Sequence, residues 1–270
     1  MTSPALDLLD RLRAIGIGRA ALFLDVDGTL HPIVDRPEEV RLPAQMVNIL
    51  RGLHEASGGA LALVSGRGMS DLDRICAPLT LPLAASHGAQ WRNGSGEVRQ
   101  VNTDAGAIEE FITVLDPLQR AHPGLQLERK SMSLAMHYRH APACEQLVID
   151  TMQALVAAHS ATHALQAGKC VLEIVPRGVS KGAAIGRFMQ RPPFWGRHPI
   201  FIGDDLTDES GFKMVNQLDG LSVKVGDGET LARHRIASVA ALQELLGQWS
   251  TELQRQALGG APSDQTRVTT

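Results

Sequence analysis

The sequence is poor in several features that mark whole classes of protein. Its only cysteines are Cys76, Cys144 and Cys170, and no two of them form a CxxC pair. This odd and scattered set does not favour a disulfide framework or a thiolate zinc site, and it suits a reducing compartment such as the cytoplasm. No apolar run approaches the ~18 residues of a membrane span. We therefore expect a cytoplasmic protein without a membrane partner.

Positive charge is also scarce. The formal net charge is −3, and only five of the 26 basic residues are lysines. A nucleic-acid-binding domain usually carries a concentrated basic face, so we expect no nucleic-acid partner. The ten histidines include no HExxH pair, which removes the usual motif of a zinc protease. The remaining composition, 44% hydrophobic and 20% charged, is that of an ordinary globular protein.

The order of apolar segments predicts an α/β fold. Residues 20–24 and 60–64 are short apolar runs without alternation, as expected for parallel strands buried on both faces. Helical patterns at residues 43–56 and 70–76 follow these strands. The same kind of buried strand returns at residues 200–202. This alternation indicates a Rossmann-like parallel sheet with crossover helices.

The pattern changes near residue 88, which predicts an inserted unit. Residues 91–101 have the pattern of a hairpin, in which Asn93-Gly94 favours a tight turn. Two helical and several strand-like segments follow, up to residue 175. We therefore divide the chain into an α/β core, an inserted α+β module that is a candidate cap, and a frayed tail, with the following bounds: residues 1–87 and 175–258, residues 88–174, and residues 259–270.

Polar residues cluster where three predicted strands end. The clusters are Asp25 with Asp27, Ser65 with Gly66 and Arg67, and Asp204 with Asp205 and Asp208. In an open parallel sheet such strand ends share one crevice. Two carboxylates ~4 Å apart repel by about 4 kcal/mol at an effective dielectric of ~20, so a cation is expected among them. An oxygen-only ligand set favours Mg²⁺. The alternative is that each cluster is only a helix cap or a solvated loop.

The order of these clusters resembles the four motifs of haloacid dehalogenase superfamily phosphatases. The matching residues are 25–29 (Asp-Val-Asp-Gly-Thr), Ser65, Lys181 and 203–208 (Gly-Asp-Asp-Leu-Thr-Asp). The resemblance covers most of the chain, and the insertion falls where this superfamily places a type-two cap. It implies a phosphatase that works through an aspartyl-phosphate intermediate.

The resemblance also implies roles for the clustered residues. Asp25 would be the nucleophile, and Asp27 would protonate the leaving oxygen and then activate water. Lys181 would hold both the Asp25 carboxylate and a phosphate oxygen. The phosphoryl group would be bound by Ser65, Gly66, Arg67 and Lys181. Mg²⁺ would be held by Asp25, Asp204 and the backbone carbonyl of Asp27, with Asp208 or Asp205 nearby or acting through water; we rank Asp208 first.

More narrowly, the sequence is similar to trehalose-6-phosphate phosphatases, through residues 128–130, 135–139, 168–174, 180–182 and 203–209. This likeness implies that Glu128, Lys130 and Glu173 bind sugar hydroxyls and that the small-molecule substrate is trehalose 6-phosphate. Glu173 stands in an apolar stretch, where a carboxylate is costly unless it has a partner.

Three points stay open at this level. The substrate could be another sugar phosphate, and the chain could be a regulatory module that binds a sugar phosphate without turnover. His87 could lie at a hinge or line the cleft, with hinges expected at residues 86–88 and 175–178. The chain could be a monomer or a weak dimer.

Overall fold

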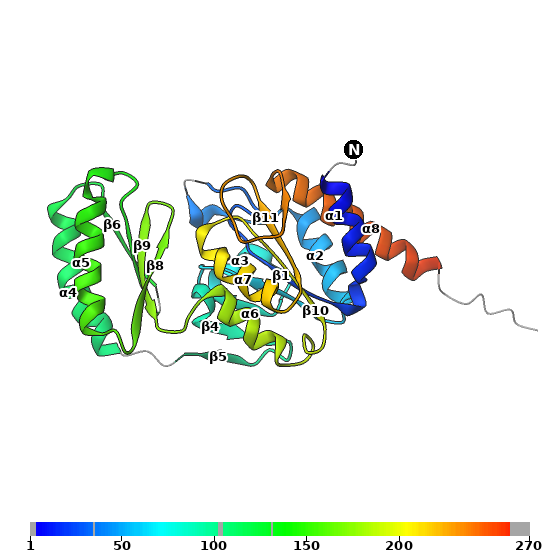
Figure 1. Cartoon of the computed structure of the whole chain (residues 1–270), viewed down its shortest axis with the longest axis horizontal. Helices are drawn as coiled ribbons and strands as arrows, with labels where there is room; N and C mark the ends of the chain where they lie inside the picture. The colour runs from blue at the N-terminus through cyan, green and yellow to red at the C-terminus, as the bar shows by residue number, and fades with distance from the viewer. Residues whose placement is uncertain (1–3, 35, 102–104, 131, 260–270) are drawn as a thin grey trace, which may run out of the picture.

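The computed structural model describes residues 4–34, 36–101, 105–130 and 132–259, and within these ranges it forms two sheets (Figure 1). The predicted frayed tail lies outside the described residues, apart from Gly259 at the end of the last helix. None of the helices in the described part of the chain is long and apolar enough to cross a membrane.

The larger sheet has eight strands in the order β12-β11-β10-β1-β2-β3-β4-β5. All pairs from β12 to β3 are parallel, and β4 and β5 add antiparallel strands at one edge. This confirms the predicted parallel α/β core. The strands are β1 (Ala20–Leu24), β2 (Leu61–Val64), β3 (Leu83–Ala85), β4 (Gln90–Arg92), β5 (Val98–Gln100), β10 (His198–Gly203), β11 (Leu221–Val225) and β12 (His234–Ile236).

Helices cover both faces of this sheet, which explains why its strands are apolar throughout. In β1, Leu22 and Leu24 pack with α1, α2, α3 and α8, whereas Phe23 packs with α6 and α7 on the opposite face. Every residue of β1 is buried. The helices are α1 (Pro4–Ile15), α2 (Ala44–Ala56), α3 (Met69–Cys76), α6 (Lys181–Met189), α7 (Glu209–Gln217) and α8 (Val239–Gly259).

The smaller sheet is antiparallel, in the order β6-β7-β9-β8, and its two helices cover only one face. That face holds a separate apolar core with Phe111, Leu134, Met136 and Ile174. The helices lie on the side of the sheet away from the larger unit (Figure 1). The elements are α4 (Ala105–Ala121), β6 (Gln126–Arg129), β7 (Leu134–His137), α5 (Glu145–Ala158), β8 (His163–Gly168) and β9 (Val171–Pro176).

The predicted hairpin forms, but it belongs to the larger sheet. β4 pairs with β3, so residues 90–100 extend the core sheet and not the inserted one. The expected start of the module at residue 88 therefore does not match the sheet boundary, and we use "inserted module" below for residues 105–176. The predicted tight turn is also wrong: the Asn93 side chain accepts hydrogen bonds from the N–H groups of Ser95 and Glu97, which stabilises a longer loop.

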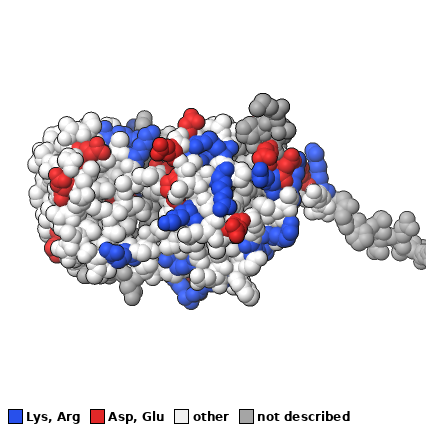
Figure 2. Space-filling model, viewed as in Figure 1, with Lys and Arg blue, Asp and Glu red and all other residues white. Residues whose placement is uncertain are grey.

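Charged side chains of both signs are interspersed over the face of the molecule seen in Figure 2. Several oppositely charged side chains of the protein form exposed ion pairs at short sequence separation, such as Arg11 with Asp7 and Arg36 with Glu39. Such exposed pairs contribute little to stability. The charges that matter for the site are the buried ones.

Candidate active site

The acidic strand ends meet at the carboxyl edge of the larger sheet. Asp25 follows β1 and Asp204 follows β10, and these two strands are parallel neighbours, with Leu24 opposite Ile202. Carboxylate oxygens of Asp25, Asp204 and Asp208 all lie within 4.8 Å of one another. The structure thus brings together the three side chains predicted for the metal site. Asp27 was expected to contribute its backbone carbonyl, which stays a prediction, and its carboxylate contacts Arg67.

The carboxylate of Asp204 fits against the turn that follows β1. Thr29 Oγ1 donates a hydrogen bond to Asp204 Oδ1 at 3.1 Å. Gly28 has a φ of +79°, and a Cβ atom there would lie 2.0 Å from Asp204 Oδ2. Any side chain at position 28 would displace the carboxylate, so glycine is required here for space as well as for conformation.

Lys181 lies at the centre of the cluster. Its Nζ donates to Asp25 Oδ1 at 2.8 Å and to Asp208 Oδ1 at 2.6 Å, and all three side chains are buried. It is the first residue of α6, whose N-cap Ser180 accepts a hydrogen bond from the Ala183 N–H. Burial lowers the pKa of Lys181, but the charges of Asp208 and Asp25 outweigh this and raise it above its ordinary value. Lys181 is therefore a fixed positive charge beside Asp25.

The cluster as a whole remains short of positive charge. Burial raises the pKa of Asp25 well above its ordinary value; Lys181 opposes the rise, and Asp208 and Asp204 add to it. Burial and the charge of Asp208 raise the pKa of Asp204 to about 6. One ammonium faces three carboxylates that supply only oxygen donors, so the residues present fit a hard divalent cation.

Asp208 acts as an anchor within this cluster. Its Oδ1 accepts from Lys181, and its Oδ2 accepts from the backbone N–H groups of Asp204 at 3.0 Å and Asp205 at 2.9 Å. Asp205 also forms a capping box with Asp208 at the 3₁₀ turn of residues 206–208. Both Asp208 oxygens accept hydrogen bonds, so Asp208 holds Lys181 and the turn that carries Asp204 in position.

Arg67 holds Asp27. The Nε and Nη2 atoms of Arg67 donate to the two Asp27 oxygens, each at 2.6 Å, which is the geometry of a bidentate charge-assisted pair. The phosphate contact expected of Arg67 stays a prediction, and its pair with Asp27 could not be predicted from the sequence. Ser65 is buried at the end of β2 and its Oγ accepts from the Arg67 N–H at 3.3 Å. Of the three predicted phosphate-binding residues 65–67, Arg67 contacts the candidate acid–base group directly.

The open face of the smaller sheet carries the predicted sugar-binding residues. Glu128 pairs with Ala135, and Ala135 with Glu173, so the two glutamates point from the same face. Glu173 accepts from Ser133 Oγ at 2.5 Å and from Lys130 Nζ at 3.0 Å, whereas Glu128 contacts His137 Nε2 at 2.9 Å. The partners predicted to be necessary for Glu173 are therefore present.

The electrostatics of Glu173 follow from these contacts. Burial would raise the pKa of Glu173, but the His87 hydrogen bond and the Lys130 charge prevail and lower it to about 2. His87 belongs to the larger unit, and its Nε2 lies 3.2 Å from Glu173 Oε2. The sequence alone is compatible with either a hinge or a cleft position for this histidine. The structure places it at the contact between the two units.

Lys224 is a site residue that the sequence analysis missed. It is buried in β11, and its Nζ donates to the backbone carbonyl oxygen of Asp204. The available signal was a lysine between Val223 and Val225 in a chain with only five lysines. Lys224 therefore places a second positive charge next to the backbone of Asp204, at a strand position that would otherwise be apolar.

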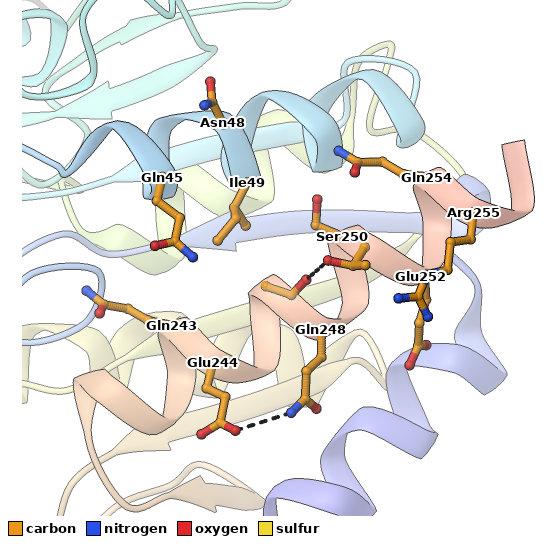
Figure 3. A pocket seen from close by; sticks show the side chains of 12 residues that line it. Gln45, Asn48, Ile49, Gln243, Glu244, Gln248, Ser250, Glu252, Gln254 and Arg255 are labelled. Carbon is orange, nitrogen blue, oxygen red and sulfur yellow. Dashed lines mark hydrogen bonds between the residues drawn. The ribbon is translucent and has the colours of Figure 1, made fainter. Parts of the chain in front are cut away.

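Two other cavities lie away from these residues. A groove of about 800 Å³ runs between α2 and α8 and is lined largely by amide and hydroxyl side chains (Figure 3). A pocket of about 520 Å³ lies beside Arg19 and Arg197. Neither of the two contains a predicted site residue.

Comparison with known proteins agrees with this geometry. Residues 23–244 match the family model described as trehalose-phosphatase. The chain is 44% identical to a trehalose-6-phosphate phosphatase of Escherichia coli strain K12, over 87% of this chain and 88% of that protein. It is 37% identical to a probable trehalose-phosphate phosphatase of Sinorhizobium fredii, over 84% of this chain and 85% of that one.

Solved structures give the same result for the fold. A Candida albicans trehalose-6-phosphate phosphatase C-terminal domain superposes with a TM-score of 0.81 at 23% identity, covering 92% of this chain and 96% of that one. A Bacteroides thetaiotaomicron phosphatase of the HAD superfamily has a TM-score of 0.59 at 17% identity, covering 86% and 94%. With a family model matching most of its length and a relative at 44% identity, the chain belongs to the trehalose-phosphatase family.

Proposed function

We propose that this protein hydrolyses trehalose 6-phosphate to trehalose and phosphate, the final step of trehalose biosynthesis, through an aspartyl-phosphate intermediate. One observation carries the proposal: Asp25 is held by Lys181 within a cluster of carboxylates, beside a module whose polar face presents the buried Glu173. The activity named for the relative at 44% identity supports the choice of substrate.

The acidic cluster fits Mg²⁺. Asp25 and Asp204, with the backbone carbonyl of Asp27, would hold the ion, and Asp208 lies within the same cluster. When bound, the ion would neutralise charge on the phosphoryl oxygens. Lys181 contributes a second positive charge on the Asp25 side, where it would contact a phosphate oxygen. Together they would reduce the repulsion between an anionic nucleophile and an anionic ester.

The chemistry proceeds in two displacements. A carboxylate oxygen of Asp25 attacks phosphorus, the Asp25 O–P bond forms, and the bond between phosphorus and the sugar oxygen breaks. The carboxylic acid form of Asp27 gives its proton to that oxygen, and trehalose leaves. The Asp27 carboxylate then takes a proton from water, whose oxygen attacks the aspartyl-phosphate, and phosphate leaves with Asp25 restored. Arg67 engages both Asp27 oxygens in this structure, so one of them must leave Arg67 to carry the proton while Arg67 holds the other.

The inserted module would select the sugar. Glu128, Lys130 and Glu173 lie on its polar face, and carboxylates and an ammonium each bind several hydroxyls. We propose that the module acts as a cap that closes over the substrate, excludes bulk water and opens to release product. The proposal includes a cytoplasmic enzyme, monomeric or weakly dimeric, that acts on a small molecule and has no nucleic-acid or membrane partner.

The test is phosphate release from a panel of sugar phosphates, with and without added Mg²⁺. We expect kcat/KM for trehalose 6-phosphate to exceed that for glucose 6-phosphate and other monosaccharide phosphates by about 10-fold or more, the scale of one or two buried polar contacts. Preference for another sugar phosphate would keep the chemistry and change the substrate. Binding without turnover of any of them would instead make the chain a regulatory module.

A further inference from the structure

The chain between β3 and β4 adopts an unusual backbone. Ser86, His87 and Gly88 form a single 3₁₀ turn, and all three have positive φ values, 48°, 56° and 99°. Residues other than glycine rarely occupy this region, because the Cβ atom approaches the backbone. Two consecutive side-chain-bearing residues in this conformation cost free energy and mark a segment that the surrounding contacts must hold in place.

Those contacts attach the turn to the candidate phosphate loop. The Ser86 N–H donates to the carbonyl of Arg67 at 2.8 Å, and the His87 N–H donates to the carbonyl of Ser65 at 2.9 Å. The His87 ring lies directly on Gly66, where a Cβ atom would be 2.6 Å from the imidazole. The imidazole thus covers the loop of residues 65–67 so closely that only glycine fits beneath it.

The same ring reaches across to the inserted module. His87 Nε2 lies 3.2 Å from Glu173 Oε2, and His87 and Glu173 are only 6% and 5% exposed. Burial lowers the pKa of His87, so the ring is neutral near pH 7. A neutral ring that donates from Nε2 carries its lone pair on Nδ1. One uncharged side chain therefore contacts the phosphate loop on one side and the sugar-face carboxylate on the other.

We propose that His87 is a positioning residue that couples sugar binding at Glu173 to the geometry of the phosphate loop at residues 65–67. This inference rests on the proposed function and deepens it. When a sugar engages the Glu173 network, the His87 ring is held against Gly66, and the two backbone hydrogen bonds hold Ser65 and Arg67 in place. Substrates that do not reach Glu173 gain nothing from this link.

The experiment compares two substrates in His87→Ala and His87→Gln: the sugar phosphate that the wild type prefers, and p-nitrophenyl phosphate, which is too small to span the two units. We expect His87→Ala to lower kcat/KM for the sugar phosphate about 30-fold and for the small ester by less than about 3-fold, in the range of ordinary site-to-site coupling. His87→Gln keeps an N–H donor that can reach Glu173 and should recover part of the loss.

A double-mutant comparison makes the test specific. If the link runs through Glu173, the double variant of His87→Ala and Glu173→Ala should lose little more than Glu173→Ala alone. His140→Ala is the control, because His140 is an exposed histidine of the same module that lies outside the predicted site residues. It should change the ratio of the two activities by less than about 2-fold, as surface substitutions usually do.

Equal losses on both substrates, additive losses in the double variant, or unchanged activity in His87→Ala would each overturn the proposal. If His87→Ala fails to fold by circular dichroism, the comparison of His87→Gln with Glu173→Gln decides in the same way. The wild-type substrate panel tests the proposed function separately. A wild type with a different preferred sugar phosphate leaves the coupling test intact, whereas an inactive wild type refutes the function itself.

Discussion

At the scale of single residues, the site depends on buried charges that constrain one another. Lys181 donates hydrogen bonds to both Asp25 and Asp208, and Lys224 donates one to the backbone carbonyl oxygen of Asp204. Removing one partner of a buried ion pair strongly destabilises the folded protein, because the other charge is left buried without compensation. The Asp25 carboxylate is thus oriented by Lys181 in the absence of substrate.

Replacing Asp25 with Asn should abolish phosphate release while the protein stays folded. An amide cannot form the aspartyl-phosphate, so we expect kcat to fall by at least about 10³-fold, as for other removed nucleophiles. The measurement is phosphate release together with circular dichroism. Asp227→Asn, in an exposed turn after β11, is the control and should lose far less. Near-normal turnover in Asp25→Asn would show that Asp25 is not the nucleophile.

The sequence predicted the positions of Asp25, Asp204 and Lys181 but not every partnership. Strand ends of neighbouring parallel strands converge whatever the loops do, so the acidic cluster could be placed from the pattern alone. Which side chain Arg67 meets depends on rotamers and on chain segments far apart in sequence. The pair with Asp27 and the contact of His87 with Glu173 therefore became visible only in three dimensions.

At the scale of elements, the inserted module has its own apolar core on one side of its sheet and the polar face on the other. Phe111 of α4 is fully buried there, and its ring meets the rings of His159 and His163 edge-on, with centroids 5.0 and 5.1 Å away. This core is separate from the two that flank the larger sheet. The module can therefore lose order without direct loss of packing around Asp25.

Phe111→Ala should separate the two parts of the function. Removing a buried phenyl ring costs about 3–5 kcal/mol, so the module should open more readily and show faster amide exchange in α4 and α5. We expect trehalose 6-phosphate hydrolysis to fall about 10-fold or more, with a smaller loss on p-nitrophenyl phosphate. Phe212→Ala, in the core beside Phe201, is the contrasting variant and should reduce both activities. Equal effects from both variants would contradict this division.

The Glu173 network should give a pH-dependent contribution to stability. The pKa of Glu173 is about 2, below its ordinary value of 4.5, so the unfolded state binds more protons between these values. Stability from this carboxylate is then complete above about pH 4.5 and is lost as the pH falls toward 2. Urea unfolding should show the largest difference between wild type and Glu173→Gln at pH 6, and a smaller one at pH 3. A difference that grows on acidification would refute the assignment.

Apolar patterns predicted the central strands and the helices that follow them, but they did not predict β3, β12, α6, α7 or α8. Unbroken apolar runs identified the central strands, because both of their faces are covered by helices. The hairpin of β4 and β5 was placed in the wrong sheet, since an antiparallel pair has the same alternation whichever sheet it joins. Its pairing with β3 depends on tertiary contacts that local sequence does not encode.

At the scale of the whole molecule, two units with separate apolar cores contact each other, and one of these contacts joins β8 of the inserted module to the 3₁₀ turn of residues 206–208. The units meet through His87 and Glu173. In the proposed mechanism, the relative position of the two units would decide whether Glu173 and Asp25 can act on the same substrate molecule.

Magnesium should stabilise the folded chain. Binding at about 100 times its Kd adds about 2.7 kcal/mol, which for a chain of this size corresponds to a rise in Tm of about 5 °C or more. We expect Mg²⁺ added after EDTA treatment to raise Tm and restore phosphate release in the wild type, and to do neither in Asp204→Asn. Full activity after rigorous chelation would exclude the metal from the reaction.

The missing side chain at Gly28 makes room for the Asp204 carboxylate in the acidic cluster. A single methyl group there would occupy the space of that carboxylate. Gly28→Ala would therefore have to turn the Asp204 carboxylate away from Asp25 and Asp208, so that one added carbon atom would open the cluster.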